Sequence, residues 1–333
     1  MVKRKSKADK SFYIKVGVIG AVLVSLIVVG LVFLNKWEED TGRFPEQEFG
    51  DSTIQFNGKE YVPNEDIETF LVMGLDKFGE DVVVDSYNND KQADFIMLFI
   101  FDNAKKQCTA IQINRDTLVD MNVLGVAGNK IGTVNGQIAL SHTYGNGRDV
   151  SCNNVINSVK SLLEGAKVTH YISMEMDAVA IINDHLGGVE VEVLDDFSGI
   201  DDTLVKGETV TLMGEHALTY IRSRKGMDNA TNAARMKRQQ QYINAMTDKL
   251  QDRIASDDEF VVDVMLDLSD YIVSDRSVNQ MEALAEKFNT YEFLGIRNIE
   301  GTSTVGEQGF VEFRPDQDAL KALIIECFYK PQN

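Results

Sequence analysis

TFLVMGL (residues 69–75) is the first of three short apolar stretches that decide the fold of this 333-residue chain. The other two are FIMLFIF (95–101) and CTAIQI (108–113), and two of the three show almost no alternation of polar and apolar residues. Strands that are buried on both faces have this pattern. The later segments alternate between helical and extended patterns, so we expect a layered α-β-α domain with a central mixed sheet.

Local signals predict several boundaries inside this domain. Asn57-Gly58 lies between TIQF and KEYV and suits a two-residue type I′ turn, which predicts a β-hairpin. Gly187-Gly188 follows a helical pattern and predicts its end, because glycine readily adopts the conformation of a helix C-cap. The longest predicted helix runs from near Asn229 to about Ile254, and a shorter helix is expected near 278–288.

An apolar segment precedes the domain. From Val16 to Leu34 nineteen residues carry no charge, and as a helix they span roughly 28 Å, close to the thickness of the hydrocarbon core. Basic residues precede this segment and acidic residues 38–40 follow it, so the positive-inside rule places the N-terminus in the cytoplasm. A cleaved signal peptide and a buried core helix are the alternatives. We therefore expect a cytoplasmic tail at 1–15, a single transmembrane helix at 16–34, a linker at 35–52 and an extracytoplasmic catalytic domain at 53–333.

Composition narrows the functional classes. The chain has 33 lysines and arginines against 52 aspartates and glutamates, a net charge of -19. Such a charge argues against a protein that coats nucleic acid, and we expect no nucleic-acid partner. Three cysteines are too few for a disulfide scaffold or a zinc site. A bridge between Cys108 and Cys152 is conceivable, and buried free thiols are the alternative.

Cations gather at two places in this acidic chain. Arg115 and Asp116 follow an apolar strand, where open α/β sheets place ligand-binding groups. Farther along, Arg222 and Arg224 precede a helix that carries Arg235, Arg238 and Gln239 at i, i+3 and i+4. The forked guanidinium group suits phosphate oxygens, which predicts an anion site. A solvated basic helix face, paired with the surplus carboxylates, is the alternative for an isolated RxxRQ pattern.

Two carboxylates flank the buried strands. Asp76 ends the first strand and Asp94 begins the second. Two aspartates at neighbouring strand ends can hold one hard divalent cation such as Mg²⁺, with water and phosphate oxygens completing the coordination. Taken alone, each would be interpreted as a turn or cap residue.

Taken together, these motifs resemble the LytR-CpsA-Psr family of cell-envelope phosphotransferases. The resemblance covers most of the chain and runs in order through FLVMGLD, ADFIMLF, INRDT, LGGVEVEV and LMGEHALTYIRSRKG. It implies that Asp76 and Asp94 bind Mg²⁺ and that Arg115 grips a diphosphate. It further implies that the remaining residues of the diphosphate clamp are Arg222, Arg224, Arg235, Arg238 and Gln239.

The chain departs from the family pattern at two positions. The family often carries an arginine soon after the first aspartate, whereas here Lys77-Phe78-Gly79 follow. Where the family usually reads DFGR, this chain has Asn232-Ala233-Ala234-Arg235. One basic and one acidic residue of the usual site are therefore missing or supplied from elsewhere.

The resemblance implies a reaction and a location. The expected function is a Mg²⁺-dependent transfer of a glycopolymer from a polyprenyl-diphosphate lipid to peptidoglycan. The expected location is the outer face of the cell membrane of a Gram-positive-type bacterium, where a single transmembrane helix anchors the protein. Asp94 and Asp116 are the candidates for taking the hydroxyl proton of the acceptor. Hydrolysis of the same diphosphate and a non-catalytic protein that binds polyprenyl phosphates are the alternatives. The four histidines show no HExxH or triad spacing and are predicted to be structural.

Overall fold

The computed structural model describes residues 53–77, 88–224, 226–227, 229–257, 260–277, 280, 284, 287–288 and 290–332. The predicted tail, anchor and linker, and most of the helix predicted near 278–288, lie outside these residues. Within the described residues, no helix is both long and apolar enough to span a bilayer. The described chain forms two compact units. Unit 1 contains Glu175–Ile272 and Arg276–Leu294, and unit 2 contains residues 53–174, Val273–Asp275 and 295–332.

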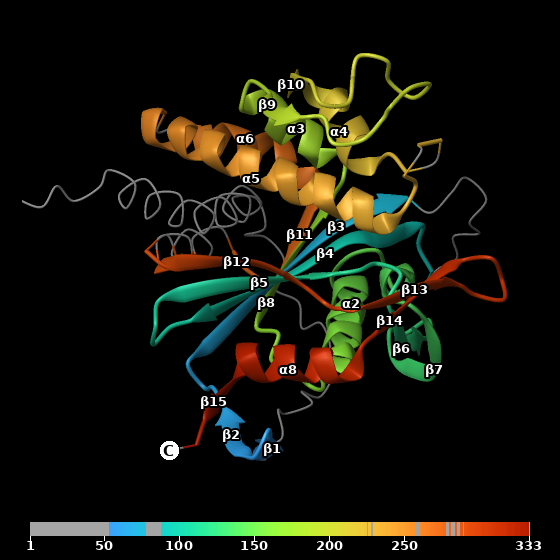
Figure 1. Cartoon of the computed structure of the whole chain (residues 1–333), viewed down its shortest axis with the longest axis vertical. Coiled ribbons are helices and arrows are strands. Elements are labelled where there is room, and N and C mark those ends of the chain that lie inside the picture. Colours follow the sequence, from blue (N-terminus) through green and yellow to red (C-terminus); the bar gives the residue numbers. More distant parts are fainter. Residues whose placement is uncertain are drawn as a thin grey trace, which may run out of the picture. The chain divides into compact units, whose positions relative to one another are not determined.

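Unit 2 is built on a six-stranded sheet with the strand order β11-β8-β3-β4-β5-β12 (Figure 1), and the fold is mixed α/β with a central mixed sheet. These strands are β3 (Ile67–Lys77), β4 (Lys91–Asp102), β5 (Gln107–Ile113), β8 (His170–Glu175), β11 (Ile272–Ser274) and β12 (Glu292–Asn298). The three apolar stretches are the central β3, β4 and β5, as predicted. β4 pairs antiparallel with both neighbours.

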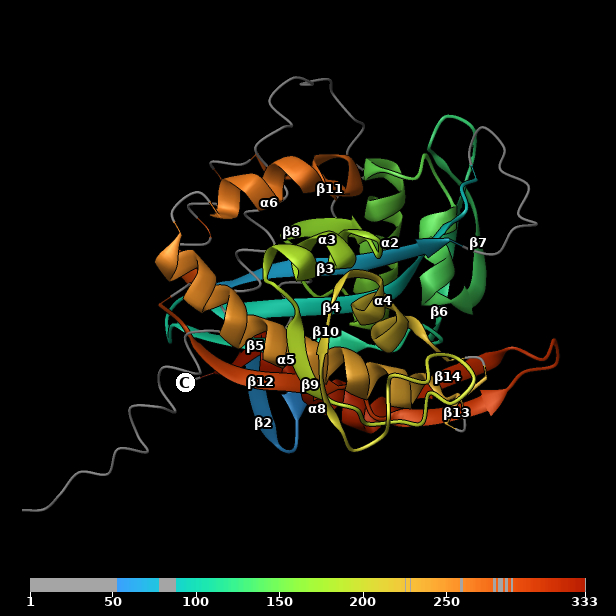
Figure 2. The same ribbon diagram turned by 90° about the horizontal axis from the view of Figure 1, so that it is seen from above.

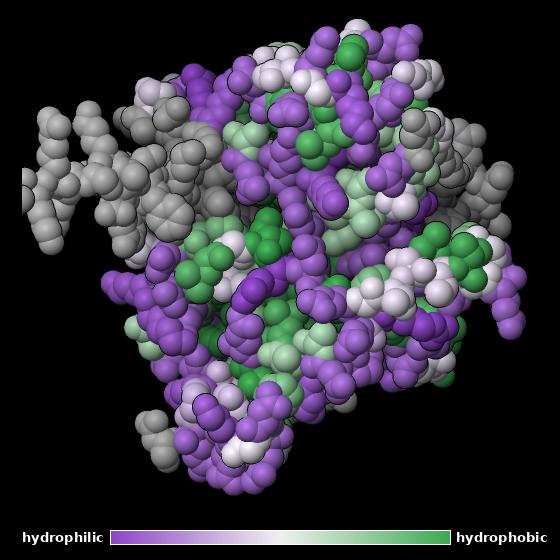
Figure 3. Space-filling view, in the orientation of Figure 1, coloured by the Kyte–Doolittle hydropathy of each residue, from purple (hydrophilic) through white to green (hydrophobic). Residues whose placement is uncertain are grey.

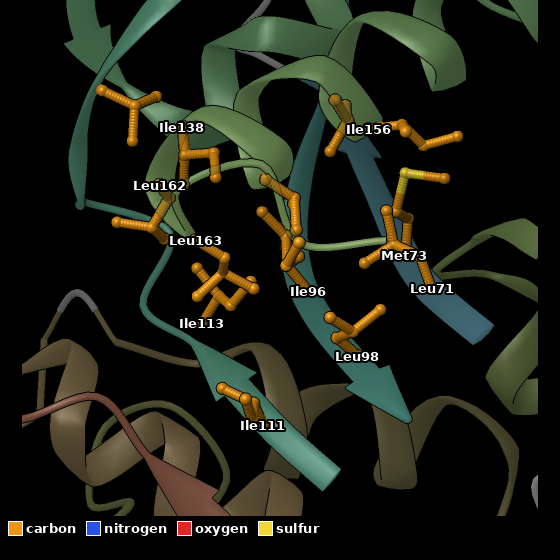
Figure 4. Packing of buried hydrophobic residues seen from close by; sticks show 14 of the residues in the cluster. Leu71, Met73, Ile96, Leu98, Ile111, Ile113, Ile138, Ile156, Leu162 and Leu163 are labelled. Atoms are coloured by element: carbon orange, nitrogen blue, oxygen red, sulfur yellow. The ribbon is translucent and has the colours of Figure 1, made fainter. Parts of the chain in front are cut away.

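Helices α2 (Asp149–Leu162) and α8 (Gln317–Phe328) cover one face of this sheet in unit 2 (Figure 1). Alternate residues of the strands point into the core beneath them, among them Leu71, Met73 and Leu98, which are fully buried (Figure 4). Removing apolar surface from water in this cluster is the main source of its stability. The short 3-10 helix η1 (Ile138–Thr143) packs with α2 and β4.

Three small sheets complete unit 2. They are β1 (Ile54–Phe56) with β2 (Lys59–Pro63) and β15 (Tyr329–Pro331), β6 (Leu118–Leu124) with β7 (Lys130–Gln137), and β13 (Gly301–Val305) with β14 (Val311–Pro315). The predicted Asn57-Gly58 hairpin is confirmed, since both residues have positive φ angles of 49° and 74°. The β6–β7 pair was not predicted, because β7 is largely exposed and lacks the apolar alternation of a half-buried strand. Exposed Val305 and Phe310 form an apolar patch at the tip of the β13–β14 hairpin (right in Figure 3).

Unit 1 is mainly helical. Its elements are α3 (Ala178–His185), β9 (Val189–Glu192), β10 (Thr209–Leu212), α4 (Gly214–Arg222), α5 (Asn232–Ser256), α6 (Phe260–Leu268) and η2 (Ser269–Tyr271). The strands β9 and β10 pair antiparallel, and α5 packs against β9, α4 and α6 (Figure 2). The long helix predicted from near Asn229 corresponds to α5.

Polar side chains of α5 cap the other helices of unit 1. Lys249 Nζ donates to the carbonyl oxygens of Gly187 and Gly188 at the end of α3, at 3.0 and 2.6 Å. The last carbonyls of a helix lack partners within the helix, and a cation there also favours the helix dipole. The predicted glycine C-cap is confirmed, because Gly187 and Gly188 have φ angles of 66° and 83°. Both α3 and its capping lysine belong to unit 1.

The cysteines of unit 2 are free thiols. Burial raises the pKa of the Cys152 thiol to about 12, and Cys152 Sγ donates to Ser173 Oγ at 3.2 Å. Cys152 also lies beside His142, whose Nδ1 is 2.9 Å from the carbonyl oxygen of Lys91. Nδ1 must carry the proton of the neutral ring, since the carbonyl can only accept. Burial lowers the pKa of His142 to about 4.

We expect the two glycines after α3 to differ in their tolerance of alanine. Both substitutions cost about 1–2 kcal/mol for the left-handed backbone. Gly188→Ala costs more, because its Cβ would lie 2.7 Å from Thr211 Cγ2 and 2.8 Å from the carbonyl oxygen of Leu212, whereas nothing lies within 4 Å of a Cβ at Gly187. Chemical denaturation of the two variants measures the difference. Equal losses would contradict this packing.

We expect acidification to destabilise unit 2 through His142. Above about pH 6.5 the ring is neutral in both the folded and the unfolded state. Between 6.5 and about 4 the unfolded chain takes up a proton that the folded state does not, so the free energy of unfolding falls as the pH falls, by about 3 kcal/mol at most. Unfolding of the wild type and of His142→Gln, measured across this range, isolates the effect. A stability difference between the two that stays constant with pH would contradict it.

Candidate functional site

A β-bulge in unit 2 lies at two of the predicted site residues, Asp76 and Asp94. The register between β3 and β4 shifts after Gly74, and Asp94 is the extra residue on β4. Beyond the bulge, Asp76 lies opposite Gln92. If Asp94 were paired in a regular ladder, Asp76 would lie opposite Ala93, and Gln92 would fall on the core face with Ile96 and Leu98. Residues directly opposite each other point to the same face of an antiparallel pair, so the bulge turns Gln92 away from the core and onto the face that carries Asp76.

Arg115 joins Gln92 and Asp94. Its Nη1 donates to Asp94 Oδ1 and its Nη2 donates to Gln92 Oε1 at 2.9 Å. Its Nε lies 3.4 Å from Asp116 Oδ1. Only 8% of Arg115 is exposed, so this charge is held in a region of low dielectric, where its interactions are stronger than in water. The structure thus brings together the three residues predicted to be catalytic, Asp94, Arg115 and Asp116.

The turn after β5 fixes the backbone of Arg115. Asn114 Oδ1 accepts from the Asp116 amide at 2.9 Å, and the Asn114 carbonyl oxygen accepts from the Thr117 amide and hydroxyl at 3.0 and 2.6 Å. Asparagine favours such turns because its side chain can mimic a backbone group. The INRDT sequence therefore builds a rigid turn that orients the guanidinium group toward β4.

Asp116 is held more tightly than Asp94. Its side chain is 2% exposed and that of Asp94 is 10% exposed. Gln137 Nε2 donates both to Asp116 Oδ1 at 3.0 Å and to the carbonyl oxygen of Val311 at 2.7 Å. A proton acceptor must come within hydrogen-bond reach of its donor, so Asp94 is the more accessible of the two candidate bases.

The acidic residues of this group fit a magnesium ion only in part. Among the described residues, no group of three or more His, Cys, Asp or Glu side chains is arranged to hold a metal. Mg²⁺ usually binds one or two carboxylates and completes its shell with water and substrate phosphates. Asp76 and Asp94 supply donors of this kind, and both come from the strand ends joined at the bulge.

Unit 1 holds the second group of predicted residues, around the end of α4 and the start of α5. Arg222 is exposed, with Nη1 3.7 Å from Asp177 Oδ1, and Arg224 is half-buried. Arg235 is buried in the first turn of α5, where its Nη2 donates to Asn232 Oδ1 at 2.6 Å. This turn holds no acidic residue, so the partial positive charge of the helix N-terminus adds to that of Arg235.

Arg238 and Gln239 contact the end of α4 in unit 1. Arg238 Nε donates to the carbonyl oxygen of Tyr220 at 2.9 Å, and Gln239 Nε2 donates to that of Ile221 at 3.4 Å. Both side chains are buried, Arg238 completely. They bind the end of α4, so they occupy a different environment from the exposed Arg222.

Three residues near the predicted ones were not identified from the sequence. Gln92 and Gln137 bind Arg115 and Asp116, and Asp195 pairs with Arg238. Gln92 left a weak signal, because it is a polar residue three positions before the apolar stretch of β4. Gln137 and Asp195 lie in ordinary polar segments, and only the tertiary structure identifies their partners.

The histidines have structural environments. His142 and His170 are buried in unit 2, and His170 lies between Glu68 and Asp275. In unit 1, His216 contacts both Thr203 and Asp201 through the same nitrogen, Nε2. A catalytic relay needs the two ring nitrogens to bind different groups, so this trio lacks that geometry.

We expect Gln92→Leu to destabilise unit 2 by about 1–3 kcal/mol, because a buried guanidinium loses an acceptor that an apolar side chain cannot replace. Gln92→Glu restores an acceptor and should remain close to the wild type at neutral pH. Denaturant unfolding of the two variants provides the comparison. A Gln92→Leu protein as stable as the wild type would show that this hydrogen bond contributes nothing.

Comparison with known proteins identifies the family. TagU of Halalkalibacterium halodurans, a polyisoprenyl-teichoic acid--peptidoglycan teichoic acid transferase, is 25% identical over 239 residues, 71% of each chain. TagT of Bacillus subtilis, which carries the same enzyme name, is 30% identical over 202 residues, 57% of this chain and 55% of TagT.

Solved structures share the fold. The crystal structure of B. subtilis TagV matches with a TM-score of 0.59 at 21% identity, over 79% of this chain and 96% of that one. TagT bound to LIIa-WTA matches with a TM-score of 0.56 at 20% identity, over 84% and 95%. Residues 35–326 match the LytR_cpsA_psr family as a whole, and the chain therefore belongs to that family.

Proposed function

We propose that this protein is a transferase that attaches a glycopolymer, carried on a polyprenyl diphosphate, to peptidoglycan. Family membership and the teichoic acid transferase names of its relatives support a transferase. The observation that carries the finer proposal is the buried Arg115, held between Asp94 and Gln92 at the bulge of β4. A guanidinium group bound in this way offers a preformed site for phosphate oxygens.

Asp94 and Arg115 act as a pair in the proposed reaction. When the donor binds, its phosphate oxygens compete with the Asp94 carboxylate for the guanidinium group, because both are anions of similar geometry. Asp94 is then able to take the proton of the acceptor hydroxyl. The hydroxyl oxygen forms a bond to the phosphorus that carries the glycopolymer, the bond from that phosphorus to the bridging oxygen breaks, and polyprenyl phosphate leaves. Arg115 stabilises the charge that develops on the phosphates.

We include Mg²⁺ in the proposal, because the carboxylate oxygens of Asp76 and Asp94 would bind it. Bound there, the ion would neutralise charge on the diphosphate. An aspartate that coordinates a cation is a weaker base, so in the metal-bound form Asp116 is the alternative proton acceptor. Arg115 contacts the carboxylates of both Asp94 and Asp116. It can therefore support either residue as the proton acceptor.

In unit 1, Arg222, Arg224 and Arg235 are proposed as further diphosphate ligands on the strength of the family resemblance. Arg222 is exposed and Arg224 is half-buried, so both are accessible to a ligand. Arg235 adds its charge at the N-terminus of α5, beside the neutral side chain of Asn232. Where the family pattern has an aspartate, this chain has the neutral amide of Asn232, which itself brings no negative charge to the site.

The apolar segment Val16–Leu34 supports a membrane location. We place the protein in the cell membrane with a single span, the N-terminus inside and the domain outside. An anchor of this kind would keep the domain at the surface where a lipid-linked donor resides, which raises the local concentration of the two partners. The envelope of a Gram-positive-type bacterium fits the organisms of the teichoic acid transferases.

The test is turnover of a polyprenyl-diphosphate sugar by the full chain, with and without Mg²⁺ and with a peptidoglycan acceptor. We expect release of polyprenyl phosphate that depends on Mg²⁺ and on the acceptor. Asp94→Asn should lower the rate by about 100-fold or more, as for loss of a general base. The matched control is Asp102→Asn, at the opposite end of β4, where Asp102 pairs with Lys105. It should keep the wild-type rate.

Other results would redirect the proposal. Release at the same rate without acceptor would identify a hydrolase. Binding of the lipid without turnover, in the presence of acceptor and Mg²⁺, would identify a binding protein. An Asp94→Asn protein with full activity would contradict the proposed role of the bulge residue.

A further inference from the structure

Arg238 is the largest fully buried side chain among the described residues. All three of its side-chain nitrogens have partners in unit 1. Nε donates to the carbonyl oxygen of Tyr220 at 2.9 Å, Nη2 donates to that of Ser223, and Nη1 donates to Asp195 Oδ2. Its guanidinium carbon lies 5.3 Å from the centroid of the Phe197 ring, which adds a cation–π contact.

The two carbonyl partners, of Tyr220 and Ser223, lie at the end of α4. The last carbonyl groups of a helix have no partner inside the helix, and they carry its partial negative charge. Arg238 satisfies two carbonyls in this region with one cation, and Gln239 binds a third. Ser223 lies between Arg222 and Arg224 in the chain. A bond to the Ser223 carbonyl therefore fixes the backbone from which both arginines extend.

We propose that Arg238 is a positioning residue rather than a diphosphate ligand. It holds the end of α4 so that Arg222 and Arg224 are presented in a fixed geometry, and Asp195 is its counterion. The proposal rests on the proposed function, because it takes the diphosphate to be what Arg222 and Arg224 bind. It changes the role that the RxxRQ pattern alone would assign to Arg238.

Energetics favour this assignment. An anion that bound Arg238 would have to displace Asp195 or backbone carbonyls from a guanidinium group with no exposed surface. Breaking a buried ion pair leaves a charge without compensation, which is strongly unfavourable. The side chain of Arg222, by contrast, is 39% exposed. Part of this side chain is therefore directly accessible to a ligand.

Asp195→Asn distinguishes the two roles by the sign of its effect. The probe is inorganic pyrophosphate, titrated into the full chain. For a positioning residue, loss of the counterion loosens the end of α4, and we expect the dissociation constant to rise several-fold. For a direct ligand, removal of a competing carboxylate strengthens anion binding. Tighter binding of pyrophosphate by Asp195→Asn would therefore overturn the proposal.

A double-mutant cycle tests whether Arg238 affects pyrophosphate binding through Arg222 and Arg224. Arg238→Gln should weaken pyrophosphate binding about tenfold in the wild-type background and have no further effect in Arg222→Ala/Arg224→Ala, because the residues through which it acts are gone. An effect that persists in that background would overturn the proposal. The matched control is Arg253→Gln on the same helix, where Arg253 pairs with Asp257 near the C-terminus of α5. It should leave the affinity unchanged.

Hydrogen exchange separates this inference from the proposed function. The Ser223 amide donates to the Thr219 carbonyl at 3.1 Å in the last turn of α4. We expect Arg238→Gln to accelerate exchange at Ser223, with the rate unchanged in Arg253→Gln. Failure of the wild type to bind pyrophosphate would count against the proposed function alone. Unchanged exchange at Ser223 in Arg238→Gln would overturn the positioning role, whatever the ligand.

Discussion

The register shift between β3 and β4 is the constraint on which the site in unit 2 depends. The strands are buried, and their core-facing residues alternate with those on the opposite face. One extra residue reverses that alternation for everything beyond it. At Asp94 the reversal puts Ala93 on the core face and Gln92 on the opposite face, across from Asp76. The core packing that fixes the register therefore also fixes the positions of the carboxylates. A change in the apolar strands would alter the site even without touching a polar residue.

The strands of the central sheet could be predicted from the sequence, but the bulge between them could not. Long apolar strands, the Asn57-Gly58 turn and the glycine end of α3 each have a local physical cause, so they could be predicted. The bulge has no local physical cause of comparable strength in the sequence. Around Asp94 the sequence reads ADFI, and without strict alternation no shift of period can be seen. The exposed β7 was missed for the opposite reason, since its polar residues do not distinguish a strand from a loop.

The same limit applies to the candidate residues. Helical periodicity placed Arg235, Arg238 and Gln239 on adjoining positions of one helix. It could not say what lies opposite them. In unit 1 the end of α4 lies against Arg238 and Gln239, whereas Arg235 is beside Asn232. Three residues of one motif therefore have different environments, because a turn of α5 is enough to change the neighbouring element. Helical spacing predicts which residues share a face of the helix, and the tertiary structure determines what those residues contact.

The arginines differ in whether an incoming anion can displace their hydrogen-bond partners. Arg238 is bound by two backbone carbonyls and a carboxylate, and the carbonyls cannot leave without unwinding the helix end that they belong to. Arg115 is bound by side chains, which can rotate away when a competing anion arrives. Arg235 has a neutral amide beside it, so an incoming phosphate would meet no repulsion from that partner. A buried arginine is thus able to serve a ligand when its partners are side chains. When the partners are main-chain carbonyls, the guanidinium group stabilises the fold and does not bind a ligand.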